Sequence, residues 1–208
     1  MRPFDDATRR NIAGRCTAFA RLAEGEQPSA LKRAAVAVTL TAAGEGSDTA
    51  LLLTLRASSL RAHRGQWALP GGRCDEGETP VEAALRELEE ELGLRLAQDA
   101  VLGLLDDYPT RSGYLITPVV VWAAGSGAIT PNPQEVASVH RIALATIERE
   151  DAFDFVAIPQ STRRVIRFHH QGGLIHAPTA ALIYQFREVL AGRATRVAEL
   201  EQPVFAWK

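Results

Sequence analysis

The residues best suited to chemistry lie between Gly71 and Leu94, where glutamates are crowded directly after a Pro-Gly-Gly turn. Carboxylates three or four residues apart on a helix repel one another, by about 0.2–0.5 kcal/mol per pair. A divalent cation relieves this repulsion, and Mg²⁺ and Mn²⁺ prefer oxygen ligands. The turn glycines carry no Cβ, so the backbone there can closely approach a metal or a phosphate. The segment therefore favours a divalent-metal site over a solvated acidic face.

The glutamates are predicted to lie on one short helix. Thr79 is a natural N-cap, Pro80 suits the first helical position, Glu82 completes a capping box, and Gly93 ends the helix. At about 100° per residue, one apolar stripe collects several side chains: Val81, Ala84, Leu85, Leu88 and Leu92.

Three further carboxylates, those of Glu87, Glu90 and Glu91, fall on an adjoining arc of the same helix. They should therefore converge beside the edge of the core, with Glu91 bordering the stripe. Arg86 is four residues from both Glu82 and Glu90, and we expect it to pair with both and to fix their rotamers.

Composition excludes several classes of protein. The 208 residues are 46% hydrophobic and 23% charged, and the net charge is −2, which argues against a general nucleic-acid binder. Cys16 and Cys74 are far apart and form no pair typical of a disulfide framework or a zinc ribbon. No signal segment or membrane span is evident. We therefore expect a cytoplasmic protein that acts on a small molecule, with no nucleic-acid or membrane partner; a homodimer is left open.

The elements that must position the helix form an alternating pattern of helices and strands. An N-terminal helix is expected at about 5–23, with Ile12, Cys16, Phe19 and Leu22 on its apolar face, and a C-terminal helix at about 179–191. Five segments are strand-like: 33–40, 50–56, 101–105, 115–123 and 136–144. The pattern indicates a single α/β domain over residues 1–208, a sandwich with a mixed sheet.

The acidic segment resembles the box of the Nudix hydrolases, G-x5-E-x7-R-E-U-x-E-E-x-G-U, in which U is a bulky aliphatic residue. Every specified position matches: Gly72, Glu78, Arg86, Glu87, Leu88, Glu90, Glu91, Gly93 and Leu94. The resemblance implies a Nudix-type α/β/α sandwich. It also implies that Mg²⁺ or Mn²⁺ assists hydrolysis of a nucleoside diphosphate linked to another group.

The resemblance also implies roles for individual residues. Glu87 and Glu91 would be the main metal ligands, with Glu90 and the Gly72 carbonyl as further ligands. Arg86 would hold the glutamates in place, and Glu78 would stabilise the loop, paired with Arg86 or with a metal-bound water. The catalytic base is left open between Glu87, Glu90 and Glu135.

The segment before the box resembles the upstream motif of coenzyme A pyrophosphatases, LLTxR[SA]x3Rx3Gx3FPGG. The matches are Leu52, Leu53, Thr54, Arg56, Ala57, Arg61, Gly65, Pro70, Gly71 and Gly72, whereas Leu69 stands where the motif has Phe. This likeness implies cleavage of coenzyme A or its derivatives into 3′,5′-ADP and 4′-phosphopantetheine or its acyl form. Arg56, Arg61, His63 and Gly71 would bind the substrate, since arginine suits phosphate oxygens.

Two alternatives are kept. Pro109 lies sixteen residues after Gly93, where ADP-ribose pyrophosphatases carry a proline, so ADP-ribose or another nucleoside diphosphate derivative is the second substrate class. A non-catalytic Nudix-fold module that binds a nucleotide is the third reading, although such a module would be expected to lose box carboxylates.

Overall fold

A mixed β-sheet forms the centre of the molecule. The computed structural model describes residues 2–22, 31–44, 48–58, 65–125 and 127–206, and within them the main sheet has eight strands. The central order is β3-β2-β1-β7-β5; β4 also pairs with β1, β6 with β7, and β8 with β2. β1 and β7 run parallel, and the other pairs are antiparallel. The strands are β1 (Lys32–Ala42), β2 (Thr49–Arg56), β3 (Trp67–Ala68), β4 (Gly71–Arg73), β5 (Val101–Leu104), β6 (Tyr108–Pro109), β7 (Tyr114–Trp122) and β8 (Val136–Ala143).

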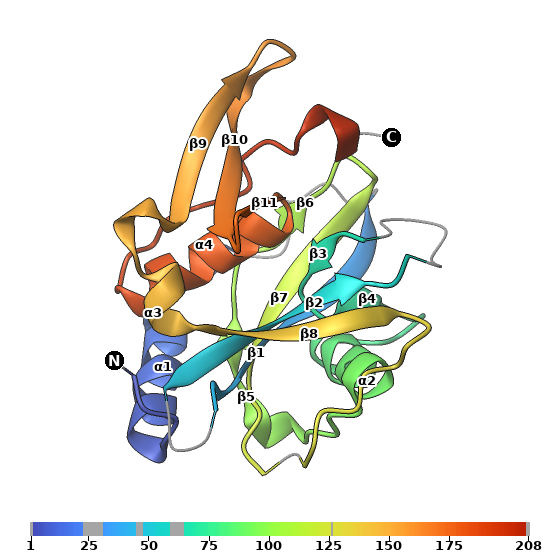
Figure 1. Cartoon of the computed structure of the whole chain (residues 1–208), viewed down its shortest axis with the longest axis vertical. Helices are drawn as coiled ribbons and strands as arrows, with labels where there is room; N and C mark the ends of the chain where they lie inside the picture. Colours follow the sequence, from blue (N-terminus) through green and yellow to red (C-terminus); the bar gives the residue numbers. More distant parts are fainter. Residues whose placement is uncertain (1, 23–30, 45–47, 59–64, 126, 207–208) are drawn as a thin grey trace.

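Helices cover both faces of this sheet (Figure 1). Because side chains alternate along a strand, Ala35 and Ala37 of β1 pack in one buried cluster with α2 (Pro80–Leu92), whereas Val38 and Leu40 pack in another. That second cluster includes Ile12 of α1 (Asp6–Ala18) and the apolar face of α4 (Thr179–Leu190). The expected α/β architecture with a mixed sheet is therefore confirmed.

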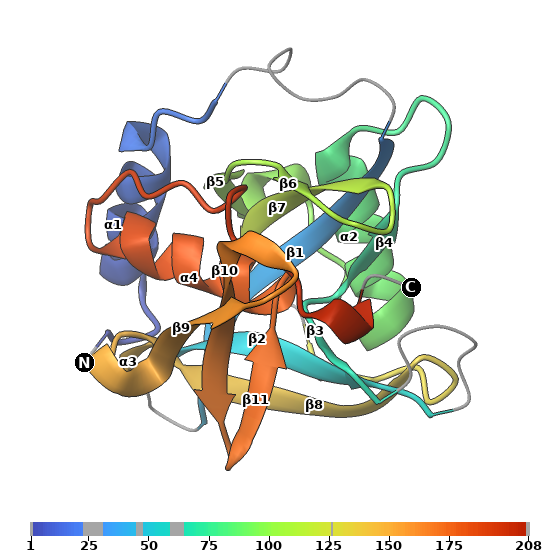
Figure 2. The same cartoon turned by 90° about the horizontal axis from the view of Figure 1, so that it is seen from above.

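A second, three-stranded sheet follows the main one in sequence. It consists of β9 (Phe153–Ile158), β10 (Ser161–His170) and β11 (Gly173–His176), in the order β11-β10-β9. Figure 1 shows the β9–β10 hairpin projecting beyond the main sheet, and in Figure 2, seen from above, the same hairpin points toward the viewer. One short helix, α3 (Leu144–Ile147), precedes it, and single turns occur at Gln98–Ala100, Glu150–Ala152 and Val204–Ala206. The sequence patterns did not predict this sheet.

The five expected strands and the C-terminal helix are found within one or two residues of their predicted bounds. The N-terminal helix is shorter than expected, because it ends at Ala18 rather than near residue 23. Beyond it, Arg21 donates to the Leu105 carbonyl and to Asp107, and the backbone N–H of Leu22 donates to Asp106. These bonds draw the chain away from the helix axis, so Leu22 is exposed instead of lying on the apolar face.

Two further expectations concern the cysteines and membrane-spanning helices. Cys16 and Cys74 are both free thiols, as predicted. In the described ranges, no helix is both long enough and apolar enough to cross a membrane.

Candidate active site

Helix α2 begins and ends as its sequence predicts. The Thr79 hydroxyl accepts from the Glu82 backbone N–H at 3.3 Å, and the Glu82 carboxylate accepts from the Thr79 N–H at 2.9 Å, so the capping box is complete. Gly93 ends the helix with φ 68°, a conformation that glycine adopts without strain. Both ends are fixed, so the positions of the carboxylates between them are well defined.

The Pro-Gly-Gly turn lies against this helix because β4 pairs with β1, which packs on α2. A Cβ at Gly72 would lie 2.2 Å from Oε1 of Glu87, and the backbone N–H of Gly71 donates to Glu91. Only glycine at position 72 leaves room for the Glu87 carboxylate where it stands. The expected proximity of the turn to the glutamates is therefore present.

Arg86 is the hub of the carboxylate cluster. Its Nε and Nη2 donate to the two oxygens of Glu78 at 2.9 and 3.1 Å, and its Nη1 donates to Glu87 and to Glu90 at 3.0 Å each. Nη2 also donates to the Arg73 carbonyl. Arg86 therefore ties the loop before the helix to two box glutamates, and it lowers the pKa of Glu78.

The predicted pairing of Arg86 with Glu82 is wrong. The Glu82 carboxylate is engaged by the backbone and hydroxyl of Thr79, while the arginine turns toward Glu78. The capping box and the ion pair compete for the same carboxylate, and the cap at the helix N-terminus takes it.

The box carboxylates differ in burial. The side chain of Glu91 is 3% exposed, that of Glu87 is 15% exposed and that of Glu90 is 54% exposed. Burial raises the pKa of Glu91 to about 8, partly offset by Arg56. Burial also raises the pKa of Glu87, and Arg86 opposes this rise. Buried carboxylates that retain a charge need a compensating cation close by.

The oxygen atoms of these glutamates are of the kind that a hard divalent cation prefers, although the side chains are not arranged around a common metal position. Among the residues that the structure describes, no group of three or more His, Cys, Asp or Glu side chains is arranged to hold a metal ion. Oε1 of Glu87 and Oε2 of Glu90 are bonded to Arg86, whereas each carboxylate carries a second oxygen. Carboxylate oxygens and a backbone carbonyl such as that of Gly72 are ligands that Mg²⁺ and Mn²⁺ accept.

Arg56 and Glu135 also lie beside the box. Arg56, at the end of β2, places Nη1 3.7 Å from Glu91, and its Nε is buried without a hydrogen-bond partner among the described residues. Glu135 precedes β8; it accepts from Asn132 and is close enough to raise the pKa values of both Glu87 and Glu91. Arg61 and His63 fall outside the described residues.

A cavity of about 420 Å³ opens at the Pro-Gly-Gly turn. Gly71, Gly72 and Arg56 line it on the side of the box, and residues from four other segments complete its walls. Several wall residues were not identified from the sequence, because they lie far from the box in the chain: Tyr114, Ile116, Leu182 and Gln202. Their types are common in cores, and no local motif marks them.

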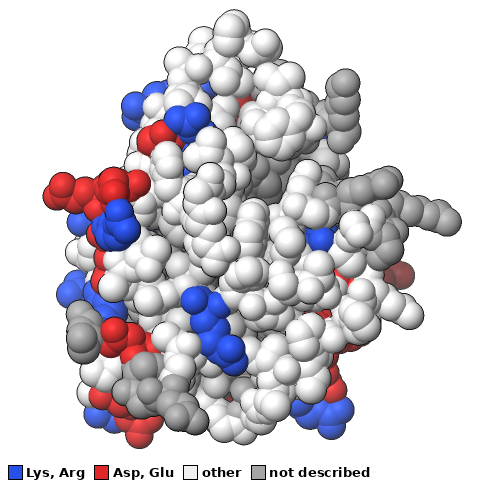
Figure 3. Space-filling model, viewed as in Figure 1, with Lys and Arg blue, Asp and Glu red and all other residues white. Residues whose placement is uncertain are grey.

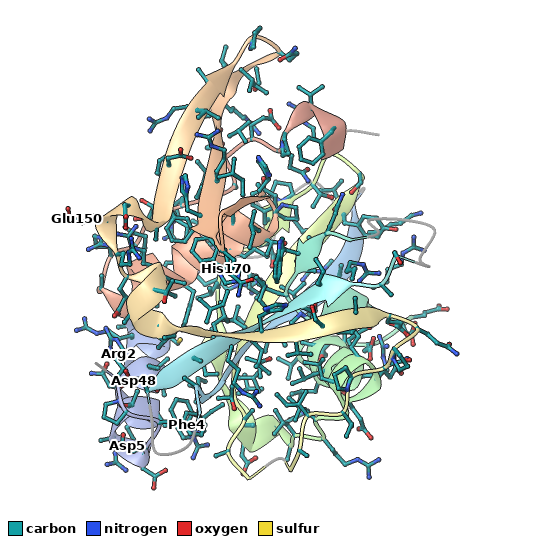
Figure 4. All side chains as sticks on the ribbon, viewed as in Figure 1. Arg2, Phe4, Asp5, Asp48, Glu150 and His170 are labelled. Atoms are coloured by element: carbon teal, nitrogen blue, oxygen red, sulfur yellow. The ribbon has the colours of Figure 1, made fainter. Side chains whose placement is uncertain are left out.

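An aromatic cluster that the sequence also did not reveal supports one wall of the cavity. The ring of Trp67 is 4.6 Å from that of His140 and 5.1 Å from that of His170, with edge-to-face geometry in both pairs. His140 accepts or donates a hydrogen bond with Ser138 at 2.8 Å. In Figure 4, His170 lies where β10 approaches the main sheet. The cluster therefore holds Trp67 at the junction of the two sheets.

Charged side chains lie mainly along the rim of the face drawn in Figure 3, and the centre of that face is largely uncharged. This view shows no broad basic surface, in agreement with the net charge of −2. Recognition of phosphate on this face would depend on individual arginines.

Comparison with known proteins agrees with the site. Residues 31–160 match the model of the NUDIX domain. An uncharacterized Nudix hydrolase, NudL, from Photorhabdus laumondii is 34% identical over 141 residues, which cover 66% of this chain and 75% of the relative. A protein of the same name from Pectobacterium atrosepticum is 35% identical over 147 residues, covering 69% and 76%.

A solved MutT/nudix family protein from Enterococcus faecalis has a similar fold, with a TM-score of 0.50 at 22% identity, over 82% of this chain and 62% of that one. The residues of the box, their position on a capped helix and the length of chain that these matches cover all point to the same family. The chain belongs to the Nudix hydrolases, enzymes that hydrolyse the pyrophosphate bond of nucleoside diphosphate-linked substrates.

Proposed function

We propose that this enzyme cleaves coenzyme A or its derivatives into 3′,5′-ADP and 4′-phosphopantetheine or the corresponding acyl form. One observation supports this choice of substrate. Arg56, which belongs to the upstream segment that resembles the coenzyme A motif, forms an ion pair with Glu91 and lines the same cavity as Gly71 and Gly72. Its buried Nε has no hydrogen-bond partner within the part of the chain that the structure describes and is suited to donate to a phosphate oxygen. Arg61 and His63 are proposed as further substrate contacts on sequence grounds alone.

Glu87, Glu91, Glu90 and the Gly72 carbonyl are the proposed ligands of Mg²⁺ or Mn²⁺. When bound, the cation neutralises charge on the pyrophosphate and lowers the pKa of water beside it. Arg86 positions Glu87 and Glu90 through its two 3.0 Å bonds. Its contact with the Arg73 carbonyl also fixes the turn that presents Gly72.

The proton acceptor is proposed to be a carboxylate beside the turn: Glu87, Glu90 or Glu135. Glu87 is held next to Gly72, and Glu90 is the most exposed of the box carboxylates. Glu135, on the segment before β8, lies close enough to Glu87 to raise its pKa. Single substitutions to glutamine separate them, because a lost base flattens the acidic limb of the pH–rate profile.

We also propose that residues 1–208 form one domain. The family match covers only residues 31–160, yet Ile12 of α1 and Phe186 of α4 belong to the same buried cluster as Val38 of β1. A separate N- or C-terminal unit would have a core of its own.

The ADP-ribose alternative has less support from the site. It rests on Pro109, and this residue lines a different cavity, between the 108–112 segment and the β9–β10 hairpin. No observation connects Pro109 with the box carboxylates.

The test compares kcat/KM for coenzyme A, acetyl-coenzyme A, ADP-ribose and ATP in Mg²⁺ or Mn²⁺, for the wild type and Arg56→Ala. We expect a coenzyme A compound to be preferred. Because charge-assisted hydrogen bonds contribute about 1.5–3 kcal/mol, Arg56→Ala should lower kcat/KM for that compound by about 10- to 100-fold. Preference for ADP-ribose or ATP in the wild type would overturn the proposal.

A further inference from the structure

The cavity beside the Pro-Gly-Gly turn has walls whose chemistry differs from that of the acidic box. Its sides are mostly apolar, with Val36 and Ile116 on the sheet, Leu69 between β3 and β4, and Leu182 on α4. A volume of about 420 Å³ lies within the range of small-molecule sites. The space can therefore enclose a substrate group that extends from a pyrophosphate held at the turn.

Neutral polar groups are spaced along these apolar walls. Gln66, Thr110, Ser112 and Gln202 contribute amides and hydroxyls, and the described residues around the cavity include no carboxylate. Among the described residues its cations are Arg56, which is directed at Glu91, and Arg73, whose guanidinium lies over the ring of Tyr114 at 5.1 Å. The rest of this described lining suits an uncharged chain that can accept and donate hydrogen bonds.

Gln202 is held at this wall by hydrogen bonds that join residues 200–202 to other parts of the chain. Arg111 and Ser161 bind the carboxylate of Glu201, and the backbone N–H of Arg111 donates to the side-chain oxygen of Gln202 at 2.6 Å. The Tyr108 hydroxyl donates to the Leu200 carbonyl at 2.7 Å. Gln202 is only 4% exposed, so its amide is held at the cavity before any ligand arrives.

From this lining we infer that the cavity binds the pantetheine arm of the substrate and that the nucleoside half lies outside it. This inference rests on the proposed function. The arm is an uncharged chain with two amides, a hydroxyl and geminal methyl groups, which match the alternating amide and apolar walls. The nucleoside half carries a 3′-phosphate, whose charges would lie against the apolar side chains of Ile116 and Leu182, because Arg56 is directed at Glu91 and Arg73 at the ring of Tyr114. Ile116 and Gln202 are thereby assigned as specificity-determining residues.

Separate binding of the two product halves tests this assignment. Calorimetric titrations with 4′-phosphopantetheine and with 3′,5′-ADP, in Mg²⁺, would compare the wild type with Ile116→Phe, which fills the cavity from its apolar wall. Leu174→Phe makes a similar enlargement on the exposed part of β11, outside the cavity. We expect Ile116→Phe to weaken 4′-phosphopantetheine binding by about tenfold or more and 3′,5′-ADP binding by less than about twofold. Leu174→Phe should change neither.

If Ile116→Phe does not fold, the same contrast is expected from Ser112→Trp, since Ser112 is exposed on the turn between β6 and β7. A selective loss of 3′,5′-ADP binding, or no change with either half, would overturn the inference. Failure of the wild type to cleave coenzyme A would instead reject the proposed function. The titrations would still report which chemical group occupies the cavity.

Discussion

Replacing Gly72 with alanine should impair catalysis while leaving the fold intact. The three heavy atoms nearest to the new Cβ would all belong to the Glu87 side chain, with Oε1 at 2.2 Å and Cδ at 2.5 Å. The φ angle of Gly72 is outside the left-handed region, so alanine fits the backbone. The carboxylate, which ends a flexible side chain, must move instead.

The size of the effect follows from these distances. Ordinary contact begins at 3.4 Å, so the carboxylate retreats by about 1 Å, a misplacement that can cost about 100-fold in rate. Loss of the Arg86–Glu87 bond costs about 1 kcal/mol. Reduced freedom of the unfolded chain offsets this by about 0.4–1 kcal/mol. We therefore expect kcat/KM to fall by about 100-fold and the free energy of unfolding to change by less than about 1 kcal/mol.

The assay measures kcat/KM for the preferred substrate at saturating Mg²⁺, together with unfolding in urea. Gly14→Ala is the control, because a Cβ at this helical position meets no described atom within 4 Å. It should leave kcat/KM unchanged. Gly71→Ala should behave differently: its φ is 153°, and its Cβ would lie 2.3 Å from the Ala35 carbonyl oxygen, so we expect a loss of about 2 kcal/mol or more. Wild-type kcat/KM in folded Gly72→Ala would refute the role of the Glu87 position.

Two further predictions concern the arginine–carboxylate contacts. Arg86→Lys keeps the charge but loses the planar fork that joins Glu78, Glu87 and Glu90, so we expect kcat/KM to fall by about tenfold or more and the melting temperature to drop; equal kinetics in both proteins would show that the fork is dispensable. Arg111 holds the pKa of Glu201 at about 2 in the folded protein, below its ordinary 4.5. The resulting stability is present above pH 4.5 and is lost as the pH falls toward 2, and it has a ceiling of about 3 kcal/mol at about 1.4 kcal/mol per pKa unit. Because Arg111 is 47% exposed, screening should reduce it to about 1–2 kcal/mol. Glu201→Gln should therefore flatten the rise in unfolding free energy between pH 2.5 and 4.5, and an unchanged slope in urea titrations would contradict this.

The parts of the fold that the sequence predicts are those with local signals. The capping box of Thr79 and Glu82 and the ending glycine set α2 within a few residues of chain, and β1 and β7 are marked by β-branched and apolar runs. By contrast, β10 exposes the polar side chains of Arg163, Arg164 and His169, and this strand is stabilised by partners elsewhere in the chain. Phe153 stacks on Phe168, and Asp154 pairs with Arg167, contacts that are not visible in a local pattern.

The candidate site also contains residues that a local sequence signal marks and residues that none marks. The box glutamates, Arg86 and Arg56 could be identified because fixed spacing and a family resemblance mark them. Spacing predicted the Arg86–Glu90 pair correctly, whereas the predicted pair with Glu82 is wrong because that carboxylate had two competing uses and the helix cap takes it. The cavity walls were also beyond local prediction, since Ile116, Leu182 and Gln202 meet only through the packing of β7, α4 and the C-terminal segment.

The most direct measurement incubates wild-type protein and Glu91→Gln with coenzyme A and Mg²⁺ and identifies the products by chromatography and mass. Glu91 is buried, and glutamine has nearly its shape, so the variant should remain folded by circular dichroism. The wild type should release 3′,5′-ADP and 4′-phosphopantetheine, and Glu91→Gln should lose at least about 100-fold of this turnover. Intact coenzyme A after incubation with the wild type, or equal product from both proteins, would contradict the assignment of this box as a coenzyme A-cleaving centre.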